Sequence, residues 1–428
     1  MARAVWRWAL WDCGATGLNA IVVTFVFSVY LTDTVGAQTG GGSSPASLLG
    51  RAMTVAGITV AVLAPLTGVL VAAPHRRRLA LATLTGLAAA LTAAMSLIRD
   101  DARYLVPGLA LLALTAACSD LASVPYNAML RQLSTPQNAG RVSATGWAAG
   151  YAGSVTLLLM IYLGFIRGDG PTRGLLQIPA ADGMNVRVAM IAAAGWLVIF
   201  ALPLLTARIV PTPDGVDHER FPGLLGSYRR LGEDLRSEWR RDRNLVYFLI
   251  VSAVFRDGLA GVFAFGAVLG VGVYGISQGD VLIFGVVAST VAALGALAGG
   301  RLDDRVGPKP VIVGSLVAMI AVGLILMSLS GPEAFWICGL LLCLFVGPTQ
   351  SASRTLLLRM TGEGKEGVAF GLYTTTGRAV AFLAPWMFFT FVDLFGTDRA
   401  GLAGICLVLA AGLAGMLGVR VPRHPVRA

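Results

Sequence analysis

The sequence predicts an all-α membrane protein in which twelve transmembrane helices form two six-helix pseudo-repeats around a central cavity. The first observation is composition: 56% of the 428 residues are hydrophobic and only 13% are charged, whereas about a quarter of the residues of a soluble globular protein are charged. The second is a series of long apolar runs, and the third is a weak repeat between the two halves of the chain. Together they exclude a water-soluble globule.

Each transmembrane helix needs about 20 mainly apolar residues to cross the bilayer core. Twelve runs meet this requirement, at residues 9–31, 48–73, 79–98, 104–127, 144–166, 187–207, 245–271, 279–300, 310–330, 334–353, 367–391 and 400–420. The first run is expected to be retained rather than cleaved, because it lacks the small-residue site of a signal peptide. Trp6, Trp8 and Trp11 are expected to anchor it at the membrane interface.

The basic residues predict the orientation of the chain. Most of the 33 Lys and Arg residues fall on the same side as the N-terminus, and Arg256 and Arg378 fall inside the membrane. Because positive charges gather in cytosolic loops, both termini of this multi-pass protein are expected in the cytoplasm, at the inner (plasma) membrane. The same bias explains the net charge of +10, so no nucleic-acid partner is expected.

The longest polar segment divides the chain into an N-terminal six-helix bundle (1–207), a linker (208–244) and a C-terminal six-helix bundle (245–428). The arginines of the linker fall largely on one side of a helix. Apolar residues recur on the other side at spacings of three and four, at Leu224, Tyr228, Leu231, Leu235 and Trp239. This pattern is typical of an amphipathic helix. We expect a strut that lies on membrane lipids at the inner surface; binding of a specific partner is the alternative.

Short motifs recur in the two halves at nearly equal separations. The Gly-x-Leu stretch that begins at Gly68, after the second run, parallels the one that begins at Gly300, after the eighth. Arg131 after the fourth run likewise parallels Arg359 after the tenth. Repeated halves are typical of secondary transporters, which bind solutes between the repeats near the bilayer midplane.

Arg256 and Asp257 lie side by side in the middle of an apolar run from Leu245 to Tyr274. A charge at this depth costs about 3 kcal/mol on insertion scales, so it is expected to be functional or paired. Adjacent helical residues point about 100° apart, so each side chain needs a partner on another helix. The candidates share polarity and membrane depth: Arg378, Asp120, Asp12, Asn19, Tyr126, Asn127 and Gln350.

Two interpretations of these charges remain open. In the structural one, an ion pair between Asp257 and Arg378 only holds helices together, and Asp12 reaches the cytosolic surface by snorkelling. In the functional one, Asp257 is the coupling carboxylate, which pairs with an arginine in one half-cycle and binds a proton in the other. Asp120 is then the next candidate for this role.

The stretch GGRLDDRVGPKP, residues 299–310, resembles the G-x-L-a-D-R-x-G-R-K loop of the major facilitator superfamily, which recurs after helices 2 and 8. The resemblance implies a conformational-gating loop made of Gly300, Asp304, Arg305, Gly307 and Lys309. Its glycines allow a tight turn and close helix approach, and Asp304 can pair with basic groups in one conformation and release them in another. An ordinary charged turn is the alternative.

The copy of this loop in the first half, GVLVAAPHRRR, departs from the pattern. Ala72 and Ala73 stand where the Asp and the following Arg are expected, which leaves Arg76, Arg77 and Arg78 as simple loop charges. We therefore expect a charge lock on one side only.

Three longer stretches resemble the vacuolar effluxer-like branch of this superfamily, also called the Unknown Major Facilitator family. They are WALWDCGATGLNAIVVTFVFSVYL, PYNAMLRQL with GRVSATGWAAGYAGS, and TQSASRTLLLRMTGEGKEGVAFGLYTTTGRAVAFLAP. The resemblance covers essentially the whole chain and implies the major facilitator fold; fungal members of the branch export amino acids from the vacuole. The chain departs from the family in the seventh run, where Arg256-Asp257-Gly258 replaces the more frequent Asn-Asp-Gly.

These features predict a monomeric secondary active transporter that works by alternating access. It would carry a small polar or amphipathic solute, such as an amino acid or another organic anion or zwitterion, by symport or antiport, including efflux. A proton is the expected coupling ion, with sodium as the alternative. A membrane receptor or scaffold of the same fold that transports nothing is the competing function.

An intramembrane enzyme is not expected. It would need a nucleophile with a base, or a metal cluster, at membrane depth, but the three histidines, His75, His218 and His424, fall in cytosolic segments. The five cysteines form no C-x-x-C pair and are expected to be small core residues. No cofactor and no metal site are predicted.

Overall fold

The structure is a computed structural model that describes residues 2–38, 44–207 and 243–421, together with the isolated positions 226, 229 and 232. Among these residues, twelve helices are long and apolar enough to cross a membrane, which confirms the predicted number. The predicted linker helix lies outside the described residues, apart from the isolated positions. The division of the chain into domains at 208–244 stays a prediction.

Helices make up almost the whole of the described chain. The first six spans comprise α1 (Ala2–Asn19), a π-helical segment (Ala20–Phe25), α2 (Phe27–Val29), a second π-helical segment (Tyr30–Val35), α3 (Pro45–Leu70), α4 (Pro74–Ala94), α5 (Leu105–Ala128), α6 (Leu130–Leu133), α7 (Ala139–Ile161), a third π-helical segment (Tyr162–Ile166) and α8 (Met184–Thr206). The last six comprise α10 (Arg243–Gly272), α11 (Gln278–Val306), α12 (Pro308–Ser328), α13 (Pro332–Met360), α14 (Glu366–Val380), α15 (Leu383–Phe395) and α16 (Asp398–Gly418).

The remaining elements are short. Single 3-10 turns occur at Gly36–Gln38, Met95–Leu97, Ala102–Tyr104 and Ala181–Gly183. An antiparallel ribbon of two strands, β1 (Thr172–Arg173) and β2 (Ile178–Pro179), lies between the fifth and sixth spans.

Proline and glycine explain where several helices begin. Pro45, Pro74, Pro308 and Pro332 lie in the first turn of their helices, where the missing N–H would have no helical partner in any case. Between α11 and α12 the chain turns through Gly307, whose φ of 91° favours glycine. This is the tight turn expected from the glycine of the gating loop.

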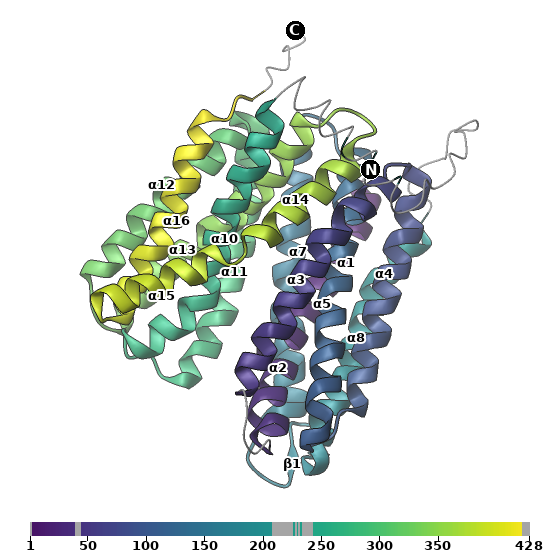
Figure 1. Cartoon of the computed structure of the whole chain (residues 1–428), viewed down its shortest axis with the longest axis vertical. Coiled ribbons are helices and arrows are strands. Elements are labelled where there is room, and N and C mark those ends of the chain that lie inside the picture. Colours follow the sequence, from purple (N-terminus) through teal and green to yellow (C-terminus); the bar gives the residue numbers. More distant parts are fainter. Residues whose placement is uncertain are drawn as a thin grey trace.

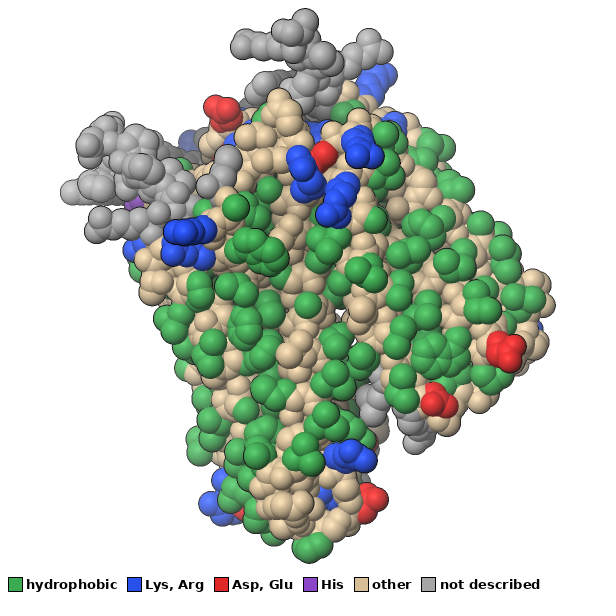
Figure 2. Space-filling model, turned by 180° about the vertical axis from the view of Figure 1, so that it is seen from behind, with side chains coloured by type: hydrophobic (Ala, Val, Ile, Leu, Met, Phe, Trp, Pro, Cys, Tyr) green, Lys and Arg blue, Asp and Glu red, His purple; other side chains and the backbone are tan. Residues whose placement is uncertain are grey.

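Figure 1 shows two bundles, with α1–α8 in one and α10–α16 in the other. The start of α1 and the end of α16 lie at the same end of the molecule, called the terminal side below. The bundles meet at the terminal side and separate toward the opposite side. Figure 2 shows hydrophobic side chains over the middle of the visible face and Lys and Arg mainly near the terminal side, as expected for a membrane protein.

Close contacts between glycines join the two bundles at the terminal side. In the first, between α3 and α14, a Cβ on Gly68 would lie 2.5 Å from the carbonyl oxygen of Gly367. In the second, between α7 and α11, a Cβ on Gly300 would lie 2.7 Å from the carbonyl oxygen of Gly140. Larger residues would push these helices apart, so the glycines permit the closed contact. We call these contacts the α3–α14 seam and the α7–α11 seam.

Two expectations about the helices are wrong. Trp8 and Trp11 are only 0% and 3% exposed, so they pack inside the protein, whereas Trp6 is 61% exposed. The eleventh span is not one helix, because α14 ends at Val380 and α15 begins at Leu383. Hydropathy alone treats this stretch as a single span. The break lies four residues before Pro385, whose ring would clash with the carbonyl group of Ala381 in a continuous helix.

Candidate functional site

A cavity of about 340 Å³ lies between the two bundles. All nine residues that the sequence predicts for an intramembrane site line it: Asp12, Asn19, Asp120, Tyr126, Asn127, Arg256, Asp257, Gln350 and Arg378. They come from five helices, α1, α5, α10, α13 and α14. The structure therefore brings the whole predicted set together, while the roles of these residues stay predictions.

A second cavity of about 350 Å³ adjoins the first. The two cavities share Thr16, Asn19, Asp120 and Arg378 in their walls. The second cavity follows the first span away from the terminal side, past Ala20, Val23 and Thr24. The site therefore extends toward the opposite side of the membrane.

Arg378 forms an ion pair with Asp120, in which Nη2 of the arginine donates to Oδ2 of the carboxylate. Arg378 lies in the last turn of α14 and Asp120 lies in α5, so the pair joins the two halves of the chain. Their side chains are 36% and 24% exposed and border the cavity. The suggested pairing of Arg378 with Asp257 is therefore wrong for this conformation.

Arg256 lies flat against Tyr373 of α14. Its guanidinium carbon is 3.6 Å from the centroid of the tyrosine ring, and Nη1 donates to the carbonyl oxygen of Tyr373 at 3.0 Å. Gly377 makes room for this contact, because a Cβ there would lie 3.1 Å from Nη2 of Arg256. A guanidinium has five N–H groups, so others remain to face the cavity that Arg256 lines.

Asp257 binds a backbone amide rather than an arginine. Its Oδ2 accepts the N–H of Ala384, in the first turn of α15, at 2.5 Å. The residue is 7% exposed, and it takes part in no ion pair among the residues that the structure describes. The expectation that an arginine holds Asp257 is therefore wrong here.

Asp12 is fixed inside the first half rather than directed to the surface. Its Oδ1 accepts from Thr16 at 3.0 Å, and its Oδ2 accepts from the hydroxyl of Tyr126 at 3.2 Å. The rings of Trp8 and Trp11 both stack on Tyr126 at 4.4 Å. These contacts contradict the alternative in which Asp12 snorkels to the cytosolic surface.

Arg354 is a cavity residue that the sequence analysis missed. It belongs to α13 of the second half, is 4% exposed and lines the cavity. Its guanidinium enters a pocket of the first half: Nε donates to Oγ of Ser143 at 3.0 Å and Nη1 donates to Oδ1 of Asn127 at 2.9 Å. The predicted span ends at residue 353, which places Arg354 in the loop that follows it.

Asp304 caps a helix of the other half. Its Oδ1 accepts the N–H of Gly140 at 2.8 Å, and its Oδ2 lies 2.7 Å from Nε of Arg141. These residues lie in the first turn of α7, where the side chain of Asn138 makes no cap. Because a carboxylate satisfies free N–H groups at a helix start, Asp304 strengthens the α7–α11 seam.

The other gating-loop residues have local contacts. Gly300 lies in the α7–α11 seam and Gly307 forms the turn, while Arg305 is exposed in the last turn of α11. Lys309 donates to the carbonyl oxygens of Leu417 and Val419, at 2.9 and 2.7 Å. It thereby satisfies carbonyl groups at the end of α16 that lack helical partners.

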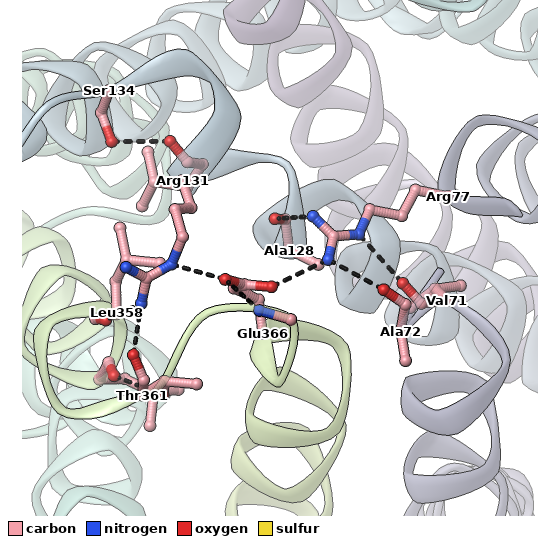
Figure 3. Close-up of polar contacts among 12 residues, drawn as sticks. Val71, Ala72, Arg77, Ala128, Arg131, Ser134, Leu358, Thr361 and Glu366 are labelled. Carbon is pink, nitrogen blue, oxygen red and sulfur yellow. Dashed lines mark hydrogen bonds and ion pairs between the residues drawn. The ribbon is translucent and has the colours of Figure 1, made fainter. Parts of the chain in front are cut away.

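Glu366 joins two arginines of the first half, as Figure 3 shows. Its Oε2 accepts from Nη2 of Arg77 at 2.9 Å, and its Oε1 lies 2.6 Å from Nε of Arg131. The side chains of Arg77 and Glu366 are only 2% and 3% exposed. Arg77 also donates to the backbone, at the carbonyl oxygens of Val71, Ala72 and Ala128. We call Glu366, Arg77 and Arg131 the Glu366 latch.

The Glu366 latch corrects two expectations about the first-half loop. Arg77 is not a simple loop charge, and the charge lock is not one-sided. The acid that Ala72 lacks is supplied instead by Glu366, at the start of α14 in the other half. The predicted span began at residue 367, so Glu366 was assigned to a loop.

The residues that the structure describes include no group of three or more His, Cys, Asp or Glu side chains placed to hold a metal ion. Solvated or membrane-embedded metal sites need several such ligands together.

Comparisons with known proteins agree with this architecture. Residues 46–428 match the family described as "Vacuole effluxer Atg22 like". The chain is 21% identical to the uncharacterized MFS-type transporter YxiO of Bacillus subtilis (strain 168) over 412 residues, which are 95% of this chain and 92% of that protein.

Solved structures show the same fold. The MFS transporter FucP in the outward conformation has a TM-score of 0.71 and 15% identity, with 98% of both chains covered. The proton:xylose symporter XylE has a TM-score of 0.71 and 14% identity, with 99% of this chain and 95% of that chain covered. Since the family match also covers most of the sequence, the chain belongs to the Atg22-like vacuole effluxer family of the major facilitator superfamily.

Proposed function

We propose that this protein is a secondary active transporter that moves a small organic solute by alternating access, with a proton as the coupling ion. The observation that carries the proposal is the ion pair between Arg378 and Asp120, which borders a cavity between two six-helix halves. A carboxylate that alternates between an arginine and a proton links proton binding to a change of conformation.

Contacts at the terminal side support the alternating-access part of the proposal. Asp304 joins α11 to α7, and the Glu366 latch joins the start of α14 to α4 and α6. The two adjoining cavities extend the other way. This arrangement corresponds to a state that is closed at the terminal side and accessible from the opposite side. Solute release at the terminal side would require both sets of contacts to break.

The charges on the cavity wall support an organic anion or a zwitterion as the solute, amino acids included. Arg256 has N–H groups beyond the one that binds Tyr373, and a guanidinium fits a carboxylate well. Asp12 is a carboxylate without an ion-pair partner among the described residues, so it suits an ammonium group. The volume of about 340 Å³ lies in the range of about 300–1,000 Å³ that is usual for small-molecule sites.

The proposed coupling pair is Asp120 with Arg378. With Asp120 ionised, the ion pair favours the present conformation; a proton on Asp120 removes the pair and favours the other one. The distribution of Lys and Arg supports cytoplasmic termini at the plasma membrane. Asp120 would then meet protons from outside the cell in the present state and release them to the cytosol in the other.

Flux measurements on purified protein in proteoliposomes test this function. The vesicles enclose a pH-sensitive dye, and amino acids and simple organic acids are added one at a time under an imposed pH gradient. We expect at least one of these solutes to change the rate of proton movement in wild-type vesicles and not in Asp120→Asn vesicles. Solute movement driven by a sodium gradient alone contradicts proton coupling, and binding without any flux indicates a receptor.

A further inference from the structure

The break in the eleventh span leaves α15 with a helix start that it cannot cap itself. The first N–H groups of a helix have no partner inside it. Phe382, at the N-cap position of α15, has no hydrogen-bonding side chain, and its φ of −91° and ψ of −15° are helical. N-cap side chains usually reach back from extended backbone. An acceptor from another helix can therefore complete the cap.

Asp257 of α10 is that partner. Its carboxylate accepts the N–H of Ala384 at 2.5 Å, and a negative charge at this end of a helix is favoured by the helix dipole. Gly261, one turn farther along α10, allows the close approach, because a Cβ there would lie 3.0 Å from Cβ of Ala384. The glycine at position 261 thus lets the start of α15 approach Asp257 on α10.

Arg256 holds the other side of the same break. It stacks on the ring of Tyr373 and donates to its carbonyl oxygen, and Tyr373 belongs to α14. Adjacent residues on α10 point in different directions, so Arg256 reaches α14 while Asp257 reaches α15. This explains why two charges stand side by side at the middle of the membrane.

The two helices at the break differ in the halves that they contact: α14 packs against both halves, whereas α15 packs mainly within the second. α14 lies mainly against α3, with further contacts to α10 and α5, whereas α15 lies mainly against α16 and also contacts α10. Figure 1 shows α14 passing between the bundles and α15 continuing within the second. Arg378 is in the last turn of α14, just before the break. The geometry of the break therefore contributes to where Arg378 lies relative to Asp120.

We infer that Asp257 is a positioning residue: by capping α15 it fixes the break in the eleventh span and keeps Arg378 within reach of Asp120. The inference rests on the proposed coupling role of Asp120 and Arg378. It also replaces the expectation that Asp257 carries the proton. A cap needs an acceptor oxygen, not a titrating group, so an asparagine side chain can serve in its place.

The test measures a distance across the opposite side of the full-length protein as the pH is varied, with the proton as the probe. Spin labels are placed on cysteines introduced at Leu97 and Leu329, which are 67% and 42% exposed and follow α4 and α12 in the two halves. The five native cysteines are buried, so they give little background labelling. The readout is the pH midpoint of the distance change.

Asp257→Asn should keep the wild-type midpoint because the acceptor oxygen remains. Asp257→Ala should move the midpoint to higher pH, so that a roughly fivefold lower proton concentration is sufficient for the distance change. The reason is that a misplaced Arg378 competes less well with the proton for Asp120. Gly261→Val, which separates α15 from α10 and leaves the carboxylate intact, should shift it in the same direction. Gly266→Val is the matched control on α10, because a Cβ at Gly266 meets no atom within 4 Å.

Three outcomes overturn the inference. Loss of the pH response in Asp257→Asn would make Asp257 the titrating group. An unchanged midpoint in both Asp257→Ala and Gly261→Val would leave the cap without influence on Arg378. If the distance in the wild-type protein does not depend on pH, the proposed coupling is wrong and the inference falls with it. This failure is distinguishable from a failure of the inference alone, because it is seen in the protein without any substitution at Asp257 or Gly261.

Discussion

In the proposed cycle, Arg378 has to remain charged inside the membrane and still release Asp120. Its planar guanidinium stays protonated and offers paired N–H groups, whereas a lysine ammonium is a compact point charge. We therefore expect Arg378→Lys to lower proton-coupled flux roughly tenfold or more. Arg51→Lys, at an exposed position on α3, is the control. Wild-type flux in Arg378→Lys would mean that a positive charge alone is sufficient.

Asp120 is expected to be the group that binds the coupling proton. Asp120→Asn keeps the size of the side chain and its ability to accept from Arg378 but removes titration. Exchange of labelled solute down its own gradient should persist, while accumulation driven by a pH difference should be lost. Asp257→Asn is the matched substitution and should retain accumulation. The opposite pattern would return the coupling role to Asp257.

The depth of charged and polar residues in apolar runs is sufficient to predict the nine cavity residues, because such residues inside a membrane usually face the bundle interior or a cavity. Their pairing was not predictable. Whether Arg378 meets Asp120 or Asp257 depends on how helices of different halves pack, which one sequence does not specify. Arg354 and Glu366 were missed for a simpler reason: each lies one residue outside a predicted span, so each was treated as a loop charge.

At the level of elements, the Glu366 latch holds the start of α14 against the first half at the terminal side, which is closed in this conformation. Removing one partner of a buried ion pair costs about 3–5 kcal/mol because the other charge is left uncompensated. Glu366→Gln should therefore shift the protein toward the terminal-open state by at least about tenfold. Spin labels at Leu79 and Val306, which are 70% and 51% exposed on α4 and α11, report the change as a longer distance.

A matched control and a rescue make this prediction specific. Glu363→Gln alters an exposed acid in the loop before α14 and should leave the distance unchanged. Ala72→Asp, combined with Glu366→Gln, returns an acid to the position where the first-half loop lacks one, beside the start of α14. This double variant should restore part of the closed population. No shift in Glu366→Gln would mean that the seams alone keep the terminal side closed.

Asp304 makes the corresponding contact at the α7–α11 seam, away from the cavity. Asp304→Asn keeps an acceptor oxygen for the N–H of Gly140 but loses the ion pair with Arg141, and exposed ion pairs are worth about 0.2–1 kcal/mol. We expect slower turnover with solute affinity changed by less than about threefold. Asp280→Asn, at the other end of α11, is the control. Weakened solute binding with normal turnover would assign Asp304 to the binding site instead.

Helix number and approximate span positions followed from hydropathy, because a membrane requires long apolar helices. The break between α14 and α15 did not, since Ala381 and Phe382 are as apolar as their neighbours. Its sequence signal is Pro385, four residues after Ala381, because a proline ring clashes with the carbonyl group of the residue four positions earlier in a helix. Asp257 of another helix caps the segment that follows. Contacts between distant segments of this kind leave no periodic signal in the sequence.

At the scale of the whole molecule, the two seams close the terminal side in similar ways. Each seam brings together glycines from the two halves, and each has an acid from the second half at a helix start, Asp304 at α7 and Glu366 at α14. Closely packed interfaces of this kind favour discrete states over continuous deformation. The halves are therefore expected to rock as units about the central cavity.

The most direct test of the account measures both sides of the protein together. Distances between spin labels at Leu97 and Leu329, on the opposite side, and at Leu79 and Val306, on the terminal side, are followed as the pH is lowered. We predict reciprocal changes with a common midpoint: the opposite side closes as the terminal side opens, and Asp120→Asn abolishes the pH dependence of both. Distances that do not respond to pH, or that lengthen together on both sides, would contradict proton-coupled alternating access.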